Sequence, residues 1–122
     1  MTSLADADLS VLVDEWLTWA DVADRLGVTV AKVRTMVRAH ELADAVPTPG
    51  AGPQVPAAFL DEDDLVVKGL PGLLTVLHDG GYDDRSCIAW LFTDAGLPGR
   101  PIDALRENRG SEAKRRAQAM GF

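Results

Sequence analysis

Residues 18–39 read TWADVADRLGVTVAKVRTMVRA, and this stretch decides the fold. Its first half repeats apolar residues at the i, i+3, i+4, i+7 spacing of one helix face: Trp19, Val22, Ala23 and Leu26. Thr18 precedes this face as an N-cap, with Asp21 in the first turn, where a carboxylate suits the helix dipole. Gly27 follows at the position where a helix commonly stops in a left-handed conformation. The pattern predicts a short helix that ends in a tight turn.

The residues after the turn predict a second helix, capped by Thr29 and running to about Ala39. On a helical wheel, one side collects apolar residues that are expected to face the first helix: Val30, Val33, Met36 and Val37. The opposite side and its margins collect small, polar and basic residues: Ala31, Lys32, Arg34, Thr35 and Arg38. Small and polar side chains can approach base edges, while Arg and Lys contact phosphates or guanine.

Two short helices joined by a glycine turn, the second with such a face, predict a helix-turn-helix. We expect the helix at about residues 30–39 to enter the major groove of duplex DNA. The expected DNA contacts are Thr29, Ala31, Lys32, Arg34, Thr35 and Arg38. The alternative is an ordinary helical hairpin whose exposed side happens to be basic.

The charge of the chain is unevenly distributed. A formal net charge of −7 over 122 residues argues against a nucleic-acid partner, because phosphate contacts need a basic surface. Residues 25–38, however, hold four basic side chains and no acidic one, and residues 106–116 hold five basic against two acidic. A segregated acidic protein can therefore bind DNA through a local patch, though more weakly at physiological salt.

The composition also indicates a compartment. Every apolar run is well short of the roughly 20 residues that a membrane span needs, and the first ten residues lack the basic region of a signal peptide. The single cysteine, Cys87, excludes an internal disulfide framework. We expect a cytoplasmic, nucleoid-associated protein with no membrane partner.

Helical signals continue on both sides of the deciding stretch. Leu9, Leu12, Val13 and Trp16 suit a helix face or an extended segment. A proline-rich loop at residues 46–56 precedes an expected strand at residues 54–60, and the acidic run at 61–64 suits a helix N-terminus. Further helices are expected from Leu70 to the Gly80-Gly81 stop, from Asp83 or Asp84 through Phe92, from Pro101, and from Ser111-Glu112.

This organisation predicts a mostly helical α+β protein. A winged helix-turn-helix at residues 1–60 is followed by a helical C-terminal domain at 61–122, packed on it partly through Leu65, Leu70 and Leu73. We expect residues 61–122 not to fold alone, since a chain of about 60 residues is marginally stable.

Residues 17–60 resemble the winged helix-turn-helix of the excisionase and MerR type. Its LT-x-x-x-x-A-x-x-LGV pattern stands here as Leu17-Thr18, Ala23 and Leu26-Gly27-Val28. The whole chain resembles a small actinobacterial, mycobacterial-type family of winged-helix DNA-binding proteins. That resemblance rests on VVKGLPGLLTVLHDGGY (66–82), AWLFT (89–93), RPIDAL (100–105) and RRAQAM (115–120). It implies duplex DNA binding, in transcription regulation or chromosome organisation, and a C-terminal helical domain.

One departure favours a different function. Wings of this type usually carry basic residues, whereas residues 43–58 contain no Lys or Arg. The second candidate is therefore a protein-interaction module with weak or no DNA binding. RPIDALRENRG (100–110) is similar to C-terminal segments of certain Xre-type antitoxins that support partner binding. Arg109, Lys114 and Arg115 are candidates for auxiliary DNA or partner contacts, or they solvate the last helix.

No catalytic, metal or cofactor site is expected. His78 and Cys87 lack a third orienting group, and a buried structural cysteine is the preferred interpretation. His40, His78 and Cys87 lack zinc-ligand spacing. A Ser/Thr protein kinase is a candidate partner, because Thr2, Ser3 and Ser10 lie in an acidic N-terminal tail where a phosphate would add about −1.5 to −2 charges.

Overall fold

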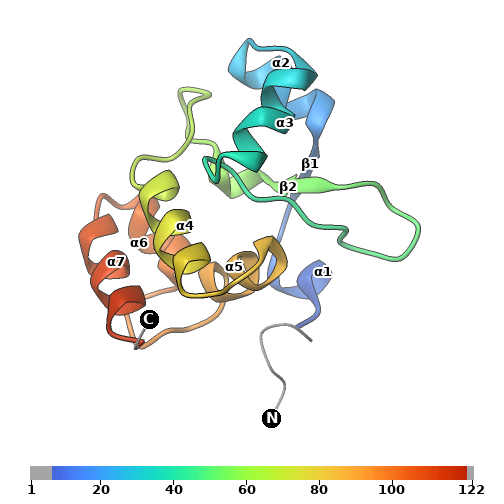
Figure 1. The fold of residues 1–122 in the computed structure, drawn as a ribbon. Helices are drawn as coiled ribbons and strands as arrows, with labels where there is room; N and C mark the ends of the chain where they lie inside the picture. The colour runs from blue at the N-terminus through green and yellow to red at the C-terminus, as the bar shows by residue number, and fades with distance from the viewer. Residues whose placement is uncertain (1–6, 121–122) are drawn as a thin grey trace.

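The computed structural model describes residues 7–120. Seven α-helices of that range and one two-stranded sheet confirm the mostly helical α+β class (Figure 1). The elements of the first half are α1 (Leu9–Leu12), β1 (Trp16–Thr18), α2 (Trp19–Leu26), α3 (Val30–Arg38), β2 (Gln54–Pro56) and the 3-10 helix η2 (Ala57–Phe59). Those of the second half are α4 (Leu70–Asp79), α5 (Asp84–Leu91), α6 (Pro101–Arg106) and α7 (Gly110–Gln118).

The predicted helix-turn-helix is α2 and α3. Thr18 and Asp21 form a reciprocal capping box at the start of α2, with both hydrogen bonds at 3.1–3.2 Å. Gly27 ends α2 with φ at 71°, and Thr29 caps α3 by accepting a hydrogen bond from the backbone N–H of Lys32 at 3.0 Å. The local sequence therefore specifies both helices and the turn between them.

One residue of the predicted inward face of α3 is not inward. Val33 is fully buried, and Met36 and Val37 pack partly against the core, but Val30 is 44% exposed. Val30 lies in the first turn of α3, and the buried contact begins one turn later at Val33. The helical repeat of apolar residues shows which side of a helix is buried, but not at which turn the buried contact begins.

The sheet holds the two ends of the N-terminal half together. β1 and β2 run antiparallel, with Leu17 paired to Val55, and an additional bridge joins Ala45 to Gln54. The segment between Ala45 and Gln54 extends from the body as the wing (Figure 1). The predicted strand at 54–60 is too long, because the chain turns into η2 directly after Pro56. Of the two interpretations of residues 9–16, helix holds for Leu9 to Leu12, and Trp16 begins the strand.

The four C-terminal helices lie close to the predicted ones, although α7 begins at Gly110, one residue before Ser111, and has no side-chain cap. Asp83 caps α5 by accepting from the N–H of Ser86 at 2.8 Å, and Pro101 opens α6. The acidic run at 61–64 is not a helix N-terminus, contrary to expectation. Asp61 instead accepts from the N–H groups of Asp63 and Leu65, which closes a tight turn. Leu65 is 60% exposed at the end of this turn, so it does not pack on the winged helix.

The two halves share one hydrophobic core. Phe59 is fully buried and its ring lies 6.1 Å from that of Phe92, centroid to centroid. The guanidinium of Arg106 in α6 donates to the carbonyl oxygens of Ala58 at 2.8 Å and Leu60 at 2.7 Å. In addition, α1 packs on α5. None of the helices within residues 7–120 is long and apolar enough to cross a membrane.

Candidate nucleic-acid interface

The structure places all six predicted DNA contacts on one exposed surface, which we call the α3 face. It consists of Thr29, Ala31, Lys32, Arg34, Thr35 and Arg38. Thr29 lies at the N-terminus of α3, where free backbone N–H groups and the helix dipole favour an anion such as phosphate. The hydroxyl of Thr35 donates to the carbonyl of Ala31 at 3.1 Å, so its remaining capacity toward a base is as an acceptor.

Arg34 is oriented by an aromatic ring. Its guanidinium carbon lies 5.5 Å from the centroid of Trp19, a cation–π contact between α3 and the first residue of α2. The indole Nε1 of Trp19 donates to Asp44 Oδ2 at 3.1 Å. Burial, followed by the nearby Asp84 carboxylate, raises the pKa of Asp44. No local sequence pattern predicts this connection, because Trp19 and Asp44 are 25 residues apart.

The wing offers no positive charge to DNA. The residues from Ala45 to Gln54 are mostly exposed and hold no Lys or Arg, and Val46 is 47% exposed. Such a loop contacts DNA only through backbone groups and shape. Within residues 29–54, the Lys and Arg side chains are therefore confined to the α3 face.

The three basic residues predicted as auxiliary contacts, Arg109, Lys114 and Arg115, lie in the C-terminal segment and outside the α3 face. Arg109 is engaged within its own half, donating to Glu112 at 3.0 Å, Glu107 at 3.1 Å and the carbonyl of Pro98 at 2.9 Å. Lys114 and Arg115 are exposed on α7, which lies away from α3 across the fold (Figure 1). The roles assigned to these three residues remain predictions.

Cys87 is buried, as expected for a structural cysteine. Burial, reinforced by Asp84 and Asp83, raises the pKa of its thiol to about 12. A nucleophilic cysteine needs the opposite shift, because the thiolate is the reactive form. The environment of Cys87 therefore opposes the chemistry that a His–Cys pair would require.

Of the three hydroxyls proposed for phosphorylation, one lies within the described residues. Thr2 and Ser3 lie outside the described residues. Ser10 lies in α1, and both its backbone N–H and its hydroxyl donate to Asp8 Oδ1, at 3.1 and 2.6 Å. Figure 1 shows α1 well separated from α3.

A capped helix-turn-helix followed by a wing and a short antiparallel pair defines a winged helix-turn-helix protein. The chain belongs to the Rv2175c family. Residues 5–60 match the family model described as "DNA-binding protein Rv2175c, wHTH domain". Residues 67–121 match the model described as "Rv2175c C-terminal domain of unknown function". The resemblance to a mycobacterial-type winged-helix family is thereby confirmed.

A sequence relative and a solved structure, both named Rv2175c, support this assignment. The chain is 44% identical over 114 residues to the DNA-binding protein Rv2175c of Mycobacterium tuberculosis (strain ATCC 25618 / H37Rv), covering 83% of this chain and 77% of that protein. The NMR structure of Rv2175c is similar in fold, with a TM-score of 0.78 at 39% identity, covering 88% of this chain and 82% of the other.

Proposed function

We propose that this chain binds duplex DNA by placing α3 in the major groove. The observation that carries the proposal is the α3 face itself, six exposed residues on the second helix of a winged helix-turn-helix. Ala31 and Thr35 are small enough to let the helix approach base edges, and Lys32 and Arg38 flank them as phosphate contacts. A family described as DNA-binding supports the same role.

The negative net charge of the chain limits its affinity for DNA. With −7 overall and an uncharged wing, most of the protein surface repels DNA, and attraction is confined to the α3 face. Affinity then depends on few phosphate contacts and falls with salt by a slope of about −0.9 per contact on log–log axes. The complex is expected to be of modest strength at physiological ionic strength.

The test is a salt titration of affinity with a mixture of genomic duplex fragments. Lys32→Ala and Arg38→Ala should each weaken binding to all fragments and flatten the slope by about 0.9. Lys68→Ala removes an exposed lysine far from α3 in sequence and should leave both quantities unchanged. Affinity that does not depend on salt, or that responds equally to Lys68→Ala, contradicts the proposal.

We further propose that this binding serves transcription regulation or nucleoid organisation in the cytoplasm, without catalysis. The raised pKa of Cys87 supports the last point, since it removes the most reactive nucleophile of the chain. The competing function is a protein-interaction module, favoured by the uncharged wing. Genome-wide crosslinking distinguishes the regulatory roles: a few sharp sites indicate a regulator, broad occupancy indicates a nucleoid factor, and none indicates the interaction module.

We propose a Ser/Thr kinase as a second partner, acting on Thr2, Ser3 or Ser10. At Ser10 a phosphate would face the Asp8 carboxylate, whose pKa is already lowered by its hydrogen bonds to Ser10. Replacing Thr2, Ser3 and Ser10 together with Asp should partially lower DNA affinity at low salt, where screening is weakest. The matched Ala variant controls for loss of the hydroxyls, and unchanged affinity in the Asp variant contradicts electrostatic control through this tail.

A further inference from the structure

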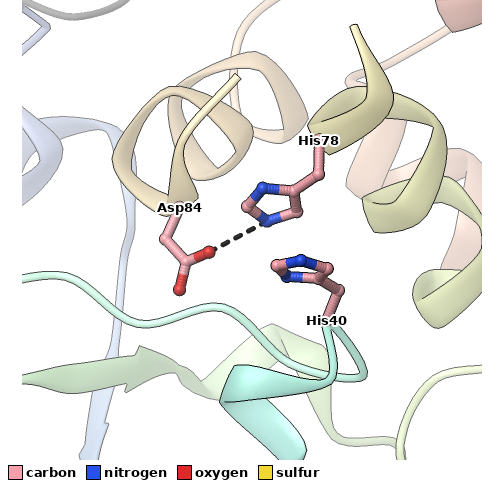
Figure 2. A group of neighbouring side chains, drawn as sticks. All are labelled: His40, His78 and Asp84. Carbon is pink, nitrogen blue, oxygen red and sulfur yellow. Dashed lines mark ion pairs between the residues drawn. The ribbon is translucent and has the colours of Figure 1, made fainter. Parts of the chain in front are cut away.

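Three potential metal ligands from distant parts of the sequence meet where the recognition helix joins the C-terminal half. His40 follows α3, His78 lies in the last turn of α4, and Asp84 begins α5. One ligand atom from each lies within 4.8 Å of the other two. Figure 2 shows the side chains converging from the three elements. All three residues are partly buried, so the cluster is sheltered from bulk water.

Two imidazole nitrogens of this cluster have no hydrogen-bond partner among the described residues. Nδ1 of His40 is buried, and within residues 7–120 it has no hydrogen-bond partner. Nε2 of His78 lies 2.9 Å from Asp84 Oδ1, an ion pair when the imidazole is protonated (Figure 2), and it has no hydrogen bond to any other described residue. An unpaired buried polar group costs free energy, so such groups call for an explanation. When a metal ion displaces the proton from Nε2 of His78, each imidazole offers a lone pair next to a carboxylate oxygen, which is the donor set of a transition metal.

The surroundings hold the carboxylate in place and add negative charge. Asp84 Oδ2 accepts a hydrogen bond from the backbone N–H of Asp44 at 3.3 Å, which leaves Oδ1 directed toward His78. The carboxyl group of Asp44 itself lies next to Asp84. Two acidic groups therefore share a partly buried site with two imidazoles, a combination that a bound dication would stabilise.

We propose that His40, His78 and Asp84 bind a divalent transition-metal ion of the zinc class. Two imidazole nitrogens and one carboxylate oxygen form a three-residue ligand set that Zn²⁺ accepts, with water as the fourth ligand. Mg²⁺ and Ca²⁺ prefer oxygen ligands alone and are disfavoured.

Metal binding requires one local rearrangement. The two imidazole rings are stacked, with centroids 3.7 Å apart and planes 23° from parallel. Imidazoles bind metals through in-plane lone pairs at about 2.0–2.1 Å, so the rings must tilt apart to aim at a shared ion.

The ion would connect the end of the recognition helix to the C-terminal half. His40 adopts a left-handed conformation, φ 61°, immediately after the C-cap of α3. A bond from His40 through the ion to α4 and α5 would fix the orientation of α3 relative to the remainder of the fold. Spacing in the sequence does not reveal such a site, because its ligands at 40, 78 and 84 assemble only in the folded chain.

The experiment uses the full chain without a histidine tag. Titration with ZnCl₂ should raise Tm in a saturable, concentration-dependent manner, and MgCl₂ at the same concentrations should not. CoCl₂ should produce the visible absorption band of four-coordinate cobalt. His40→Asn, His78→Gln and Asp84→Asn should each weaken binding about 10-fold or more; asparagine is chosen at residue 40 because it tolerates positive φ.

Matched controls separate this site from adventitious binding. Asp79→Asn changes an exposed carboxylate on α4 next to His78, and Cys87→Ala removes the single thiol; both should retain wild-type affinity. Circular dichroism of each variant without metal shows whether it is folded. The proposal is overturned if the wild-type chain shows no saturable zinc binding below about 1 mM. It is also overturned if folded His40→Asn and His78→Gln variants bind zinc as the wild type does.

Discussion

Trp19 donates a hydrogen bond from its indole nitrogen to Asp44 Oδ2 over 3.1 Å, and so joins the start of α2 to the root of the wing. The same indole ring lies beneath the guanidinium of Arg34, 5.5 Å from its centroid. One aromatic side chain therefore fixes a cation of the α3 face and the beginning of the wing relative to each other. The wing and the α3 face are thereby held together through Trp19.

Trp19→Phe should destabilise the protein more than Trp16→Phe. Both changes remove an indole of a partly buried tryptophan, but only Trp19 has a paired Nε1, whereas Nε1 of Trp16 is buried and unpaired within the described residues. A paired hydrogen bond contributes about 0.5–1.5 kcal/mol, and removing an unsatisfied donor is nearly neutral. Urea unfolding of the two variants measures the difference, and equal destabilisation contradicts the role given to the Trp19–Asp44 bond.

Arg34→Lys should lower DNA affinity even though it conserves charge. Lysine lacks the planar guanidinium that stacks on Trp19, and a cation–π contact at an exposed site contributes about 0.5–1 kcal/mol. We therefore expect a loss of about 2- to 5-fold in affinity at fixed salt, with an unchanged salt slope. Lys32 lies on the same face, and Lys32→Arg is the matched control, for which no loss is expected. Wild-type affinity for Arg34→Lys would show that Arg34 acts only as a point charge.

The thiol of Cys87 should resist modification in the folded protein. Its side chain is fully buried and burial raises its pKa to about 12, so the thiolate is absent at neutral pH. A thiol-specific reagent at pH 8 should label the native chain only as fast as it unfolds, and labelling should become rapid in urea. Rapid labelling of the native chain would mean that α5 opens locally.

The helix-turn-helix could be predicted because its determinants are local. The Thr18 cap, the Gly27 stop and the Thr29 cap each act within four residues, and all three are present in the structure. The exposed side of α3 followed from the same short-range pattern. The prediction that Val30 faces inward was wrong, because Val30 lies in the first turn of α3 and the buried contact begins at Val33.

The remaining features depend on contacts between distant residues. The acidic run at 61–64 has the composition of a helix start, but Asp61 binds the backbone ahead of it and makes a turn instead. The cluster of His40, His78 and Asp84 forms only when α3, α4 and α5 come together. Similarly, the sequence shows that Arg106 is basic, but only the fold shows its guanidinium bound to carbonyls of the other half.

Lowering the pH should remove the contribution of the Arg100–Asp103 ion pair to the free energy of unfolding. Its hydrogen bond to Arg100 holds the pKa of Asp103 below the ordinary carboxyl value, so the pair stabilises the fold above about pH 4. That stability is lost as pH falls through the lowered pKa. Both side chains are about one-third exposed, which limits the contribution to about 0.5 kcal/mol. Urea midpoints of the wild type and Asp103→Asn should differ at pH 7 and converge toward pH 3; a constant difference contradicts this assignment.

Residues 61–122 should not form a stable fold without residues 1–60. Separation removes fully buried Phe59 from the ring of Phe92 and uncovers the surface of α5 that packs on α1. Truncating a buried phenylalanine alone costs about 3–5 kcal/mol, a large part of the stability of a small domain. Circular dichroism of the fragment should show no cooperative thermal transition, whereas the full chain should show one.

A single substitution in the full chain tests the same junction without cutting it. Arg106→Ala leaves the carbonyl oxygens of Ala58 and Leu60 without their charged donor and should destabilise the protein by about 1–2 kcal/mol. Arg115→Ala, the control, removes an exposed arginine of α7 and should change stability by less than about 0.5 kcal/mol. Equal effects of the two substitutions would show that these hydrogen bonds of Arg106 do not stabilise the junction. A fragment 61–122 that melts cooperatively at the temperature of the full chain would show that the C-terminal half is stable without the winged helix.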